Sequence, residues 1–202
     1  MTAPDNIPLR PADMAKVATA TPGQASTKAE LRRHLLAARR ELDAESRALA
    51  AITIGLKLQG WCARHRPASL GVYWPIAAEP DLRASFDVLH GQGLQLALPL
   101  VTAPDAPLQF ARWIPGQAMQ RDAFGVQVPL DPEFVPLPDV LLIPCVGFNA
   151  ERFRLGYGGG FYDRTLDCTP RPITLGIAYA CLQTDFAPGV HDIALDEILT
   201  ER

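Results

Sequence analysis

Apolar residues recur at helical spacing in the first third of the chain. Leu31, Leu35, Ala38 and Leu42 follow one another every three or four residues, which predicts a helix with one apolar stripe. The segment Thr27-Lys28-Ala29-Glu30 has the S/T-x-x-E form of a capping box, so we expect the helix to begin there.

Two more helices follow from the same pattern. Asp43 can cap a helix from about residue 44 to residue 61. In this second helix, the apolar residues expected to face inward are Leu49, Ile52, Leu56 and Trp61. A third, shorter helix is expected to start at Asp81 and to end near the glycines at 91 and 93.

Short apolar runs bounded by proline and glycine predict strands. They cover residues 69–74, 94–98, 108–113 (at an edge of the sheet), 140–148 and 173–180. The run over 140–148 is continuous, as in a parallel strand buried on both faces, and Pro144 should lie at a bulge or bend. The residues after the last strand read as loops. Strands that alternate with helices predict a three-layer α/β/α sandwich with a mostly parallel sheet.

The 202 residues fit one domain with an extension. Residues 1–25 are rich in Ala, Thr and Pro and show no periodicity, so we expect a disordered N-terminal extension. Residues 26–202 are expected to form a single α/β domain. Eight of the 19 prolines lie between Pro99 and Pro138, which predicts loops and short edge strands in that region.

Charge, apolar runs and cysteine content argue against nucleic-acid-binding, membrane and secreted proteins. A net charge of -3 is too mild for a general nucleic-acid or membrane-surface binder. No apolar run approaches the ~18 residues of a membrane span, and the first 20 residues lack a basic-then-apolar signal pattern. The four cysteines are far apart and are expected to be free thiols. These features predict a cytoplasmic protein, which we expect to be a monomer.

The most informative segment runs from Asn149 to Arg164. It places four glycines in five positions, between the strongest predicted strand and a helix expected over 161–167. Glycine lets the backbone approach a ligand closely, and consecutive amides bind phosphate well. Arg154 and Arg164 flank these glycines and can donate charge-assisted hydrogen bonds. Asp163 is the natural contact for magnesium, which prefers oxygen ligands.

Other interpretations of these residues remain open at this point. The loop has neither G-K-[ST] nor a G-x-G-x-x-G register, and glycine content alone would equally suit a flexible turn. Lys28 and Arg32 lie one helical turn apart, so they either form a solvated basic face or bind a phosphate group together. The four histidines show no metal-ligand spacing.

Ordered motifs between residues 28 and 201 resemble the 5-formyltetrahydrofolate cyclo-ligase family, also called methenyltetrahydrofolate synthetase. The motifs are Lys28-Ala-Glu-Leu-Arg32, Tyr73-Trp74 before Glu79-Pro-Asp81, Pro144-Cys-Val-Gly-Phe148, the loop from Arg154 to Arg164, and His191-Asp192 with Asp196-Glu197 near Thr200-Glu201. The resemblance implies ATP- and Mg²⁺-dependent closure of 5-formyltetrahydrofolate, with or without a polyglutamate tail, to 5,10-methenyltetrahydrofolate, with release of ADP and phosphate. It also implies a phosphorylated formyl intermediate.

The same resemblance assigns roles to residues. The ATP-binding positions it implies are Lys28, Arg32, Arg154, Leu155, Gly156, Gly158, Gly159, Gly160, Phe161 and Tyr162. The folate-binding positions are Trp74, Glu79, Tyr157 and the Gly158–Phe161 segment. Arg154, Tyr157 and Arg164 match catalytic positions, and Asp163 and Asp192 match the carboxylates associated with magnesium. Read alone, Glu79 and Asp192 are also ordinary loop residues, and Trp74 and Tyr157 ordinary packing or surface aromatics.

Two departures from the family pattern matter. The family loop usually reads G-x-G-K-G-[FY]-Y-D-R, with a lysine where this chain has Gly159, and Phe124-Gly-Val-Gln-Val-Pro129 matches a family Gly-Ile-x-x-Pro stretch only loosely. A missing cation beside a transferring phosphate would weaken catalysis. An active enzyme would need Arg154, Arg164 or Lys28 to take over the role of that lysine. The alternatives are a folate- or nucleotide-binding protein with weak or lost turnover, or a related enzyme for another phosphorylated small molecule.

Overall fold

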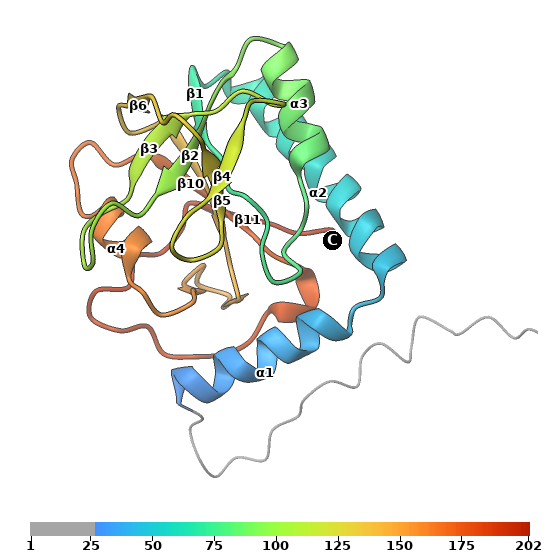
Figure 1. Cartoon of the computed structure of the whole chain (residues 1–202). Coiled ribbons are helices and arrows are strands. Elements are labelled where there is room, and N and C mark those ends of the chain that lie inside the picture. Colours follow the sequence, from blue (N-terminus) through green and yellow to red (C-terminus); the bar gives the residue numbers. More distant parts are fainter. Residues whose placement is uncertain (1–26) are drawn as a thin grey trace, which may run out of the picture.

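A seven-stranded sheet forms the centre of the computed structural model, which describes residues 27–202 (Figure 1). Its order is β11-β10-β7-β1-β2-β3-β6. The strands are β1 (Ser69–Gly71), β2 (Gln95–Leu100), β3 (Gln109–Arg112), β6 (Phe134–Val135), β7 (Val140–Pro144), β10 (Ile173–Ile177) and β11 (Glu197–Leu199). The five strands from β11 to β2 are parallel, and β3 and β6 add antiparallel pairs at one edge. The extension predicted over 1–25 lies outside the described residues.

Strand β7 is the middle one of the five parallel strands and is buried on both faces. Val140 and Leu142 belong to the core on one side of the sheet, whereas Leu141 and Ile143 belong to the core on the other. Pro144 is its last residue and pairs in register with Ile177 of β10. The prediction of a buried parallel strand is confirmed, because a strand covered on both faces needs apolar side chains at consecutive positions.

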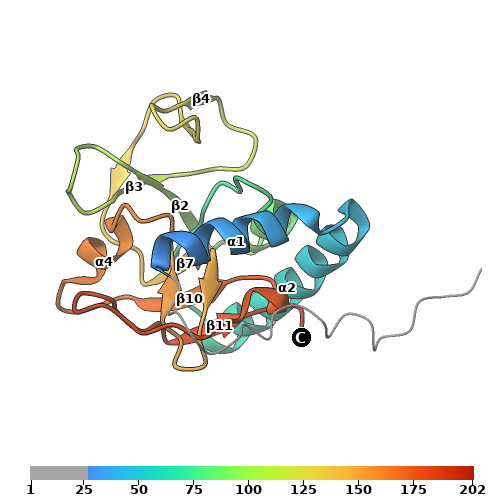
Figure 2. The ribbon, with the colours of Figure 1, turned by 90° about the horizontal axis from the view of Figure 1, so that it is seen from below.

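Helices cover both faces of the sheet, which confirms the predicted three-layer α/β/α sandwich with a mostly parallel sheet. Helices α2 (Ala44–His65) and α3 (Arg83–Gly91) pack on one face, and the short α4 (Phe161–Leu166) packs on the other (Figure 1). Helix α1 (Lys28–Glu41) lies across the end of the sheet at which the parallel strands finish (Figure 2). Its Leu35 packs there with Val146 and Leu182, which follow β7 and β10.

Both predicted helix caps are present. At α1, the Thr27 hydroxyl accepts from the Glu30 amide (3.3 Å), and the Glu30 carboxylate accepts from the Thr27 amide (2.9 Å). At α2, Asp43 accepts from the Ser46 amide at 2.8 Å. These bonds satisfy amides that have no partner within the helix, and so fix where each helix begins.

The predicted inward face of α2 is wrong for three of its four residues. Leu49, Ile52 and Leu56 are 59%, 60% and 61% exposed, and only Trp61 is buried. The buried face instead carries Ala50, Ile54, Gly55, Leu58, Trp61 and Cys62. A Cβ atom at position 55 would lie 2.1 Å from the Ser85 hydroxyl of α3, so α3 can pack this closely only against glycine. The close approach of α2 and α3, rather than the size of the apolar side chains, therefore determines which face of α2 is buried.

Several short strands escaped the sequence patterns. A hairpin joins β4 (Met119–Arg121) to β5 (Gln127–Pro129) in the proline-rich region, and β6 rather than β3 forms the sheet edge. The apolar run over 140–148 divides after Pro144, and β8 (Gly147–Phe148) pairs with β9 (Arg154–Leu155). The expectation of loops after the last predicted strand is also wrong, because β11 extends the sheet there. Strands of two or three residues are too short to show periodicity.

The expectations about the cysteines and about membrane spans can be compared with the structure of residues 27–202. All four cysteines are free: Cys62 and Cys145 are buried, and Cys168 and Cys181 are exposed. No helix within these residues is long and apolar enough to cross a membrane.

The packing of α2 yields a matched pair of stability predictions. We expect Ile54→Ala to lower the free energy of unfolding by about 2–5 kcal/mol, because this fully buried side chain would leave a cavity. Ile52→Ala makes the same chemical change on the exposed face and should cost less than about 0.5 kcal/mol. Urea unfolding followed by circular dichroism measures both, and equal losses would contradict the assignment of faces.

Candidate active site

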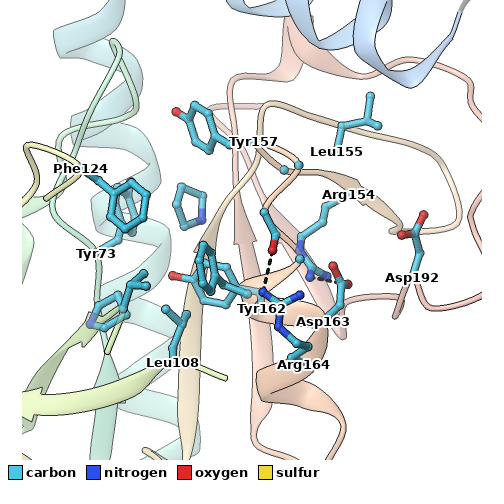
Figure 3. A pocket seen from close by; sticks show the side chains of 18 of the residues that line it. Tyr73, Leu108, Phe124, Arg154, Leu155, Tyr157, Tyr162, Asp163, Arg164 and Asp192 are labelled. Carbon is cyan, nitrogen blue, oxygen red and sulfur yellow. Dashed lines mark hydrogen bonds and ion pairs between the residues drawn. The ribbon is translucent and has the colours of Figure 1, made fainter. Parts of the chain in front are cut away.

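A cavity of about 1100 Å³ opens where the parallel strands end. Such crevices at the carboxyl ends of strands are where open α/β sheets bind ligands. All the residues to which sequence analysis assigned a site role line this cavity (Figure 3 shows part of it): Lys28 and Arg32 of α1, Trp74 and Glu79 after β1, Arg154 and Leu155 of β9, the loop residues Gly156, Tyr157, Gly158, Gly159 and Gly160, Phe161, Tyr162, Asp163 and Arg164 of α4, and Asp192. Their individual roles stay predictions.

Arg154 is fixed at the cavity wall by two partners. Its guanidinium group donates to Asp163 at 2.7 Å and to the Ile193 carbonyl at 3.1 Å, and only 8% of the residue is exposed (Figure 3). Strand β9 holds its backbone, because Arg154 pairs with Phe148 of β8. A guanidinium group locked in this way presents a preoriented positive charge to a ligand.

Lys28 and Arg32 connect α1 to two loops around the cavity. The Lys28 ammonium group lies 2.5 Å from Asp192, and the Arg32 guanidinium group donates to the Gly156 carbonyl at 2.8 Å. Partial burial favours a higher pKa for Asp192, but the Gly189 amide and the Lys28 ammonium group together lower that pKa. The two cations therefore do not form a purely solvated face.

The loop over residues 156–160, here called the glycine loop, needs glycine at two positions for conformational reasons. Gly158 and Gly160 have φ angles of +99° and +66°, a region that other residues seldom adopt. A Cβ atom at Gly160 would also lie 2.8 Å from the guanidinium group of Arg164. That guanidinium group donates to the Gly159 carbonyl at 2.7 Å, so Arg164 closes the loop from the helix that follows it.

Aromatic side chains form the opposite part of the wall. Trp74 makes an edge contact with Trp113 (6.2 Å between ring centroids), and Arg83 lies over its ring at 5.0 Å. Phe124, between β4 and β5, makes an edge contact with Phe161 at 6.3 Å and is 65% exposed. Sequence analysis did not include Phe124, although it opens the loosely matching Phe124–Pro129 stretch. A flat ligand such as a fused ring system would suit this part of the cavity.

Glu79 is a buried carboxylate at the cavity wall. It is 5% exposed, and it accepts hydrogen bonds from the Ile76 amide at 2.9 Å and from the Tyr157 hydroxyl at 2.7 Å. Burial raises the pKa of Glu79, and these two hydrogen bonds and the charge of Arg39 oppose the rise. The Tyr157 hydroxyl accepts in turn from Arg39 at 2.6 Å.

Arg39 itself escaped the sequence analysis. It is fully buried, at 0% exposure, in the last turn of α1. The available signal was its spacing, because Arg39 lies four residues after Leu35 and therefore on the apolar stripe of the helix. An arginine on such a stripe indicates a buried polar contact, since a charge rarely enters a core without partners.

The two predicted magnesium carboxylates do not form a metal centre by themselves. Within residues 27–202, no three His, Cys, Asp or Glu side chains gather closely enough to hold a metal ion. Asp163 and Asp192 each bind a cationic side chain instead. They fit a Mg²⁺ ion that takes most of its ligands from phosphate and water, because Mg²⁺ usually needs only one or two protein carboxylates.

Comparison with known proteins places the chain in a family. The model of the 5-formyltetrahydrofolate cyclo-ligase family matches residues 24–201. The 5-formyltetrahydrofolate cyclo-ligase of Mycolicibacterium smegmatis is 30% identical over 192 residues, which cover 87% of this chain and 94% of that protein. The Haemophilus influenzae protein of the same name is 34% identical over 139 residues, covering 65% and 74% of the two chains.

Solved structures are similar as well. The 5,10-methenyltetrahydrofolate synthetase of Mycoplasma pneumoniae superposes with a TM-score of 0.74 at 26% identity, covering 88% of this chain and 100% of that one. The Aquifex aeolicus enzyme gives a TM-score of 0.75 at 29% identity, covering 87% and 90% of the two chains.

The loop geometry predicts different effects for two glycine substitutions. Gly160→Ala should lower the free energy of unfolding by about 1–3 kcal/mol, because alanine is strained at this φ angle and its Cβ displaces Arg164. Gly156→Ala should lower the free energy of unfolding by less than about 1 kcal/mol. The φ angle at position 156 is not positive, and a Cβ atom there would meet open space. Urea unfolding compares the two variants, and equal stability losses would count against the loop conformation.

Proposed function

The chain belongs to the 5-formyltetrahydrofolate cyclo-ligase family, and we propose that it closes 5-formyltetrahydrofolate to 5,10-methenyltetrahydrofolate with ATP and Mg²⁺, releasing ADP and phosphate. One observation carries this proposal beyond family membership. A single cavity combines a region of cations and loop amides with a region of aromatic rings and a buried carboxylate. Two substrates, one rich in phosphate and one a flat heterocycle, can therefore meet in it.

The cationic region is the proposed ATP site. Lys28, Arg32, Arg154 and Arg164 line it together with the glycine loop, so that charged donors surround any phosphate group bound there. Leu155, Phe161 and Tyr162 add apolar surface to the same wall. Bound Mg²⁺, held by Asp163 or Asp192 together with phosphate oxygens, would supply further neutralisation of negative charge.

The aromatic region is the proposed folate site. Trp74 and Tyr157 offer rings against which a pterin can pack, and Glu79 offers carboxylate oxygens to the N–H groups of its amino-pyrimidinone edge. The loop glycines lie next to Tyr157, so the formyl group and the γ-phosphate would approach each other beside the loop.

Chemistry explains why the ring closure needs ATP. The oxygen of an N-formyl group is a poor leaving group, so it first attacks the γ-phosphorus of ATP, and the bond between that phosphorus and ADP breaks. The second folate nitrogen then attacks the carbon of the O-phosphorylated formyl group and loses its proton. Expulsion of inorganic phosphate gives the methenyl bridge. Positioning and charge neutralisation by Arg154, Arg164 and Lys28 supply most of the catalysis in such a phosphoryl transfer.

A near-ultraviolet absorbance time course tests the proposed activity. The protein is mixed with 5-formyltetrahydrofolate, ATP and magnesium, and three controls each omit one of these. We expect the methenyl chromophore to form only in the complete mixture. A flat trace from folded protein that binds both ligands would refute turnover and favour the non-catalytic alternative. In that case Gly159→Lys, which returns the family lysine, is the variant expected to restore activity, provided that the Phe161 ring moves away from the new Cβ (2.9 Å).

Arg154 should matter to the chemical step. We expect Arg154→Met to lower kcat by about 10²–10³-fold, because it removes a fixed positive charge where negative charge develops. Arg33→Met, which removes an exposed arginine of α1, should leave kcat within about twofold. Thermal unfolding first establishes that both variants are folded. A kcat close to that of the unmodified protein in Arg154→Met would contradict this role.

A further inference from the structure

The turn that carries Glu79 has an unusual backbone. Ala77 and Ala78 have φ angles of +46° and +61°, and the Glu79 amide donates to the Ile76 carbonyl at 2.9 Å. Two consecutive left-handed residues form a type I′ turn, which normally contains glycine, asparagine or aspartate. Alanine is strained in this conformation, so other contacts must hold the turn.

Arg39 supplies the contacts that reach this turn from α1. Its Nε donates to the Ala77 carbonyl at 2.9 Å, and its Nη2 donates to the Tyr157 hydroxyl at 2.6 Å. Its Nη1 lies 3.5 Å from the Cys145 carbonyl. Within residues 27–202, no carboxylate lies within 4 Å of this guanidinium group. Its negative counterpart is Glu79, reached through one hydroxyl group.

The same chain of hydrogen bonds engages both oxygens of Glu79. The Tyr157 hydroxyl donates to Oε1 at 2.7 Å, and the Ile76 amide donates to Oε2 at 2.9 Å. An ionised carboxylate can accept about four hydrogen bonds, so each oxygen keeps a further acceptor site. The carboxylate lines the cavity, which makes it a preset acceptor for two neighbouring N–H groups.

We infer that Arg39 is a positioning residue, which acts through the Tyr157 hydroxyl and the Ala77 carbonyl to hold the Glu79 carboxylate ready for the two N–H donors of the pterin edge. This inference rests on the proposed function, since it takes the folate as the ligand. Arg39 does not itself line the cavity, so its influence on the folate must pass through Tyr157 and Glu79.

A purely structural role accounts less well for these contacts. A guanidinium group is costly to bury, and well-packed apolar residues often stabilise a core equally well or better. The geometry here directs that charge at the turn that presents the buried Glu79 carboxylate to the cavity. Preorganisation of this kind lowers the entropy lost when a ligand binds.

Electrostatics predicts how the site responds to loss of these contacts. The titratable and charged groups that face Glu79 are Arg39, Tyr73, Cys145, Tyr157 and Tyr162. Burial raises the pKa of Glu79, whereas the Tyr157 hydroxyl and the Arg39 charge lower that pKa. Removing either should therefore raise it further, so that Glu79 takes up a proton at a higher pH and loses acceptor capacity.

The test is a double-mutant cycle that measures the Kd of 5-formyltetrahydrofolate. We expect Tyr157→Phe and Arg39→Met each to raise this Kd about tenfold, which corresponds to about 1.4 kcal/mol. The double variant should bind about as weakly as either single variant, because both changes break the same chain of contacts. The Kd of ATP should stay within about twofold of its original value. A general loss of stability would weaken the binding of both ligands and would not produce this difference between them.

The pH dependence of the folate Kd gives a second readout. Binding should weaken as the pH falls and Glu79 takes up a proton, which gives the plot of Kd against pH an acidic limb. This limb should move to higher pH in Tyr157→Phe and Arg39→Met. Glu79→Gln should abolish the limb. Arg40→Met, which removes an exposed arginine from the same turn of α1, is the matched control and should leave both Kd values and the limb unchanged.

The outcomes separate the inference from the proposed function. Fully additive effects of the two changes, an equal loss of ATP and folate binding, or an unmoved pH limb in Tyr157→Phe would each overturn the role of Arg39. If Arg39→Met fails to fold, Tyr157→Phe still decides the question, because Tyr157 is 46% exposed as a residue and the removal of its single hydroxyl spares the core. Unmodified protein that binds the folate but forms no methenyl product would refute the proposed turnover, and the binding cycle would still test Arg39.

Discussion

Charges withdrawn from water need partners, and this requirement shapes the whole cavity. A buried carboxylate or guanidinium group that lacks compensation costs several kcal/mol. Here three links supply it: Lys28 with Asp192, Arg154 with Asp163, and Arg39 with Glu79 through the Tyr157 hydroxyl. Two of the links join α1 to segments more than 100 residues away in sequence. The loops extend from the ends of the strands, and these links determine how the loops are arranged around the cavity.

The division of the cavity follows from the order of the elements. The cations come from α1, from β9 and from α4, all of which meet around the glycine loop. The aromatic wall comes from the segment after β1 and from the β4–β5 hairpin, on the other side. Glu79 and Tyr157 lie where the two regions join, because the hydrogen bond between them connects the turn after β1 to the loop. A site for two different ligands thus arises from the convergence of loops at one end of one sheet.

Sequence patterns predicted the elements in which many residues share one constraint. The apolar run at β7 and the capping box of α1 are of this kind, since burial on two faces and unpaired amides each dictate residue types over several positions. The faces of α2 were not predictable by periodicity, because apolar residues lie on both sides and a contact between Gly55 and Ser85 chooses between them. The burial of Glu79 was equally hidden. It depends on left-handed alanines in a turn and on an arginine 40 positions earlier in the chain, and no local pattern reports such a contact.

The ion pair between Lys28 and Asp192 also bears on when the site can form. During synthesis, residue 28 leaves the ribosome long before residue 192, and domains are made at roughly 5–20 residues per second. At that rate, roughly 8–33 s pass before the chain reaches the loop to which the first turn of helix α1 is attached, and Arg39 likewise forms before Tyr157 is made. Contacts this distant in sequence are slow to close because loop entropy opposes them. The nascent chain can build helices and the first strand pair early, but the binding cavity is one of the last features to appear.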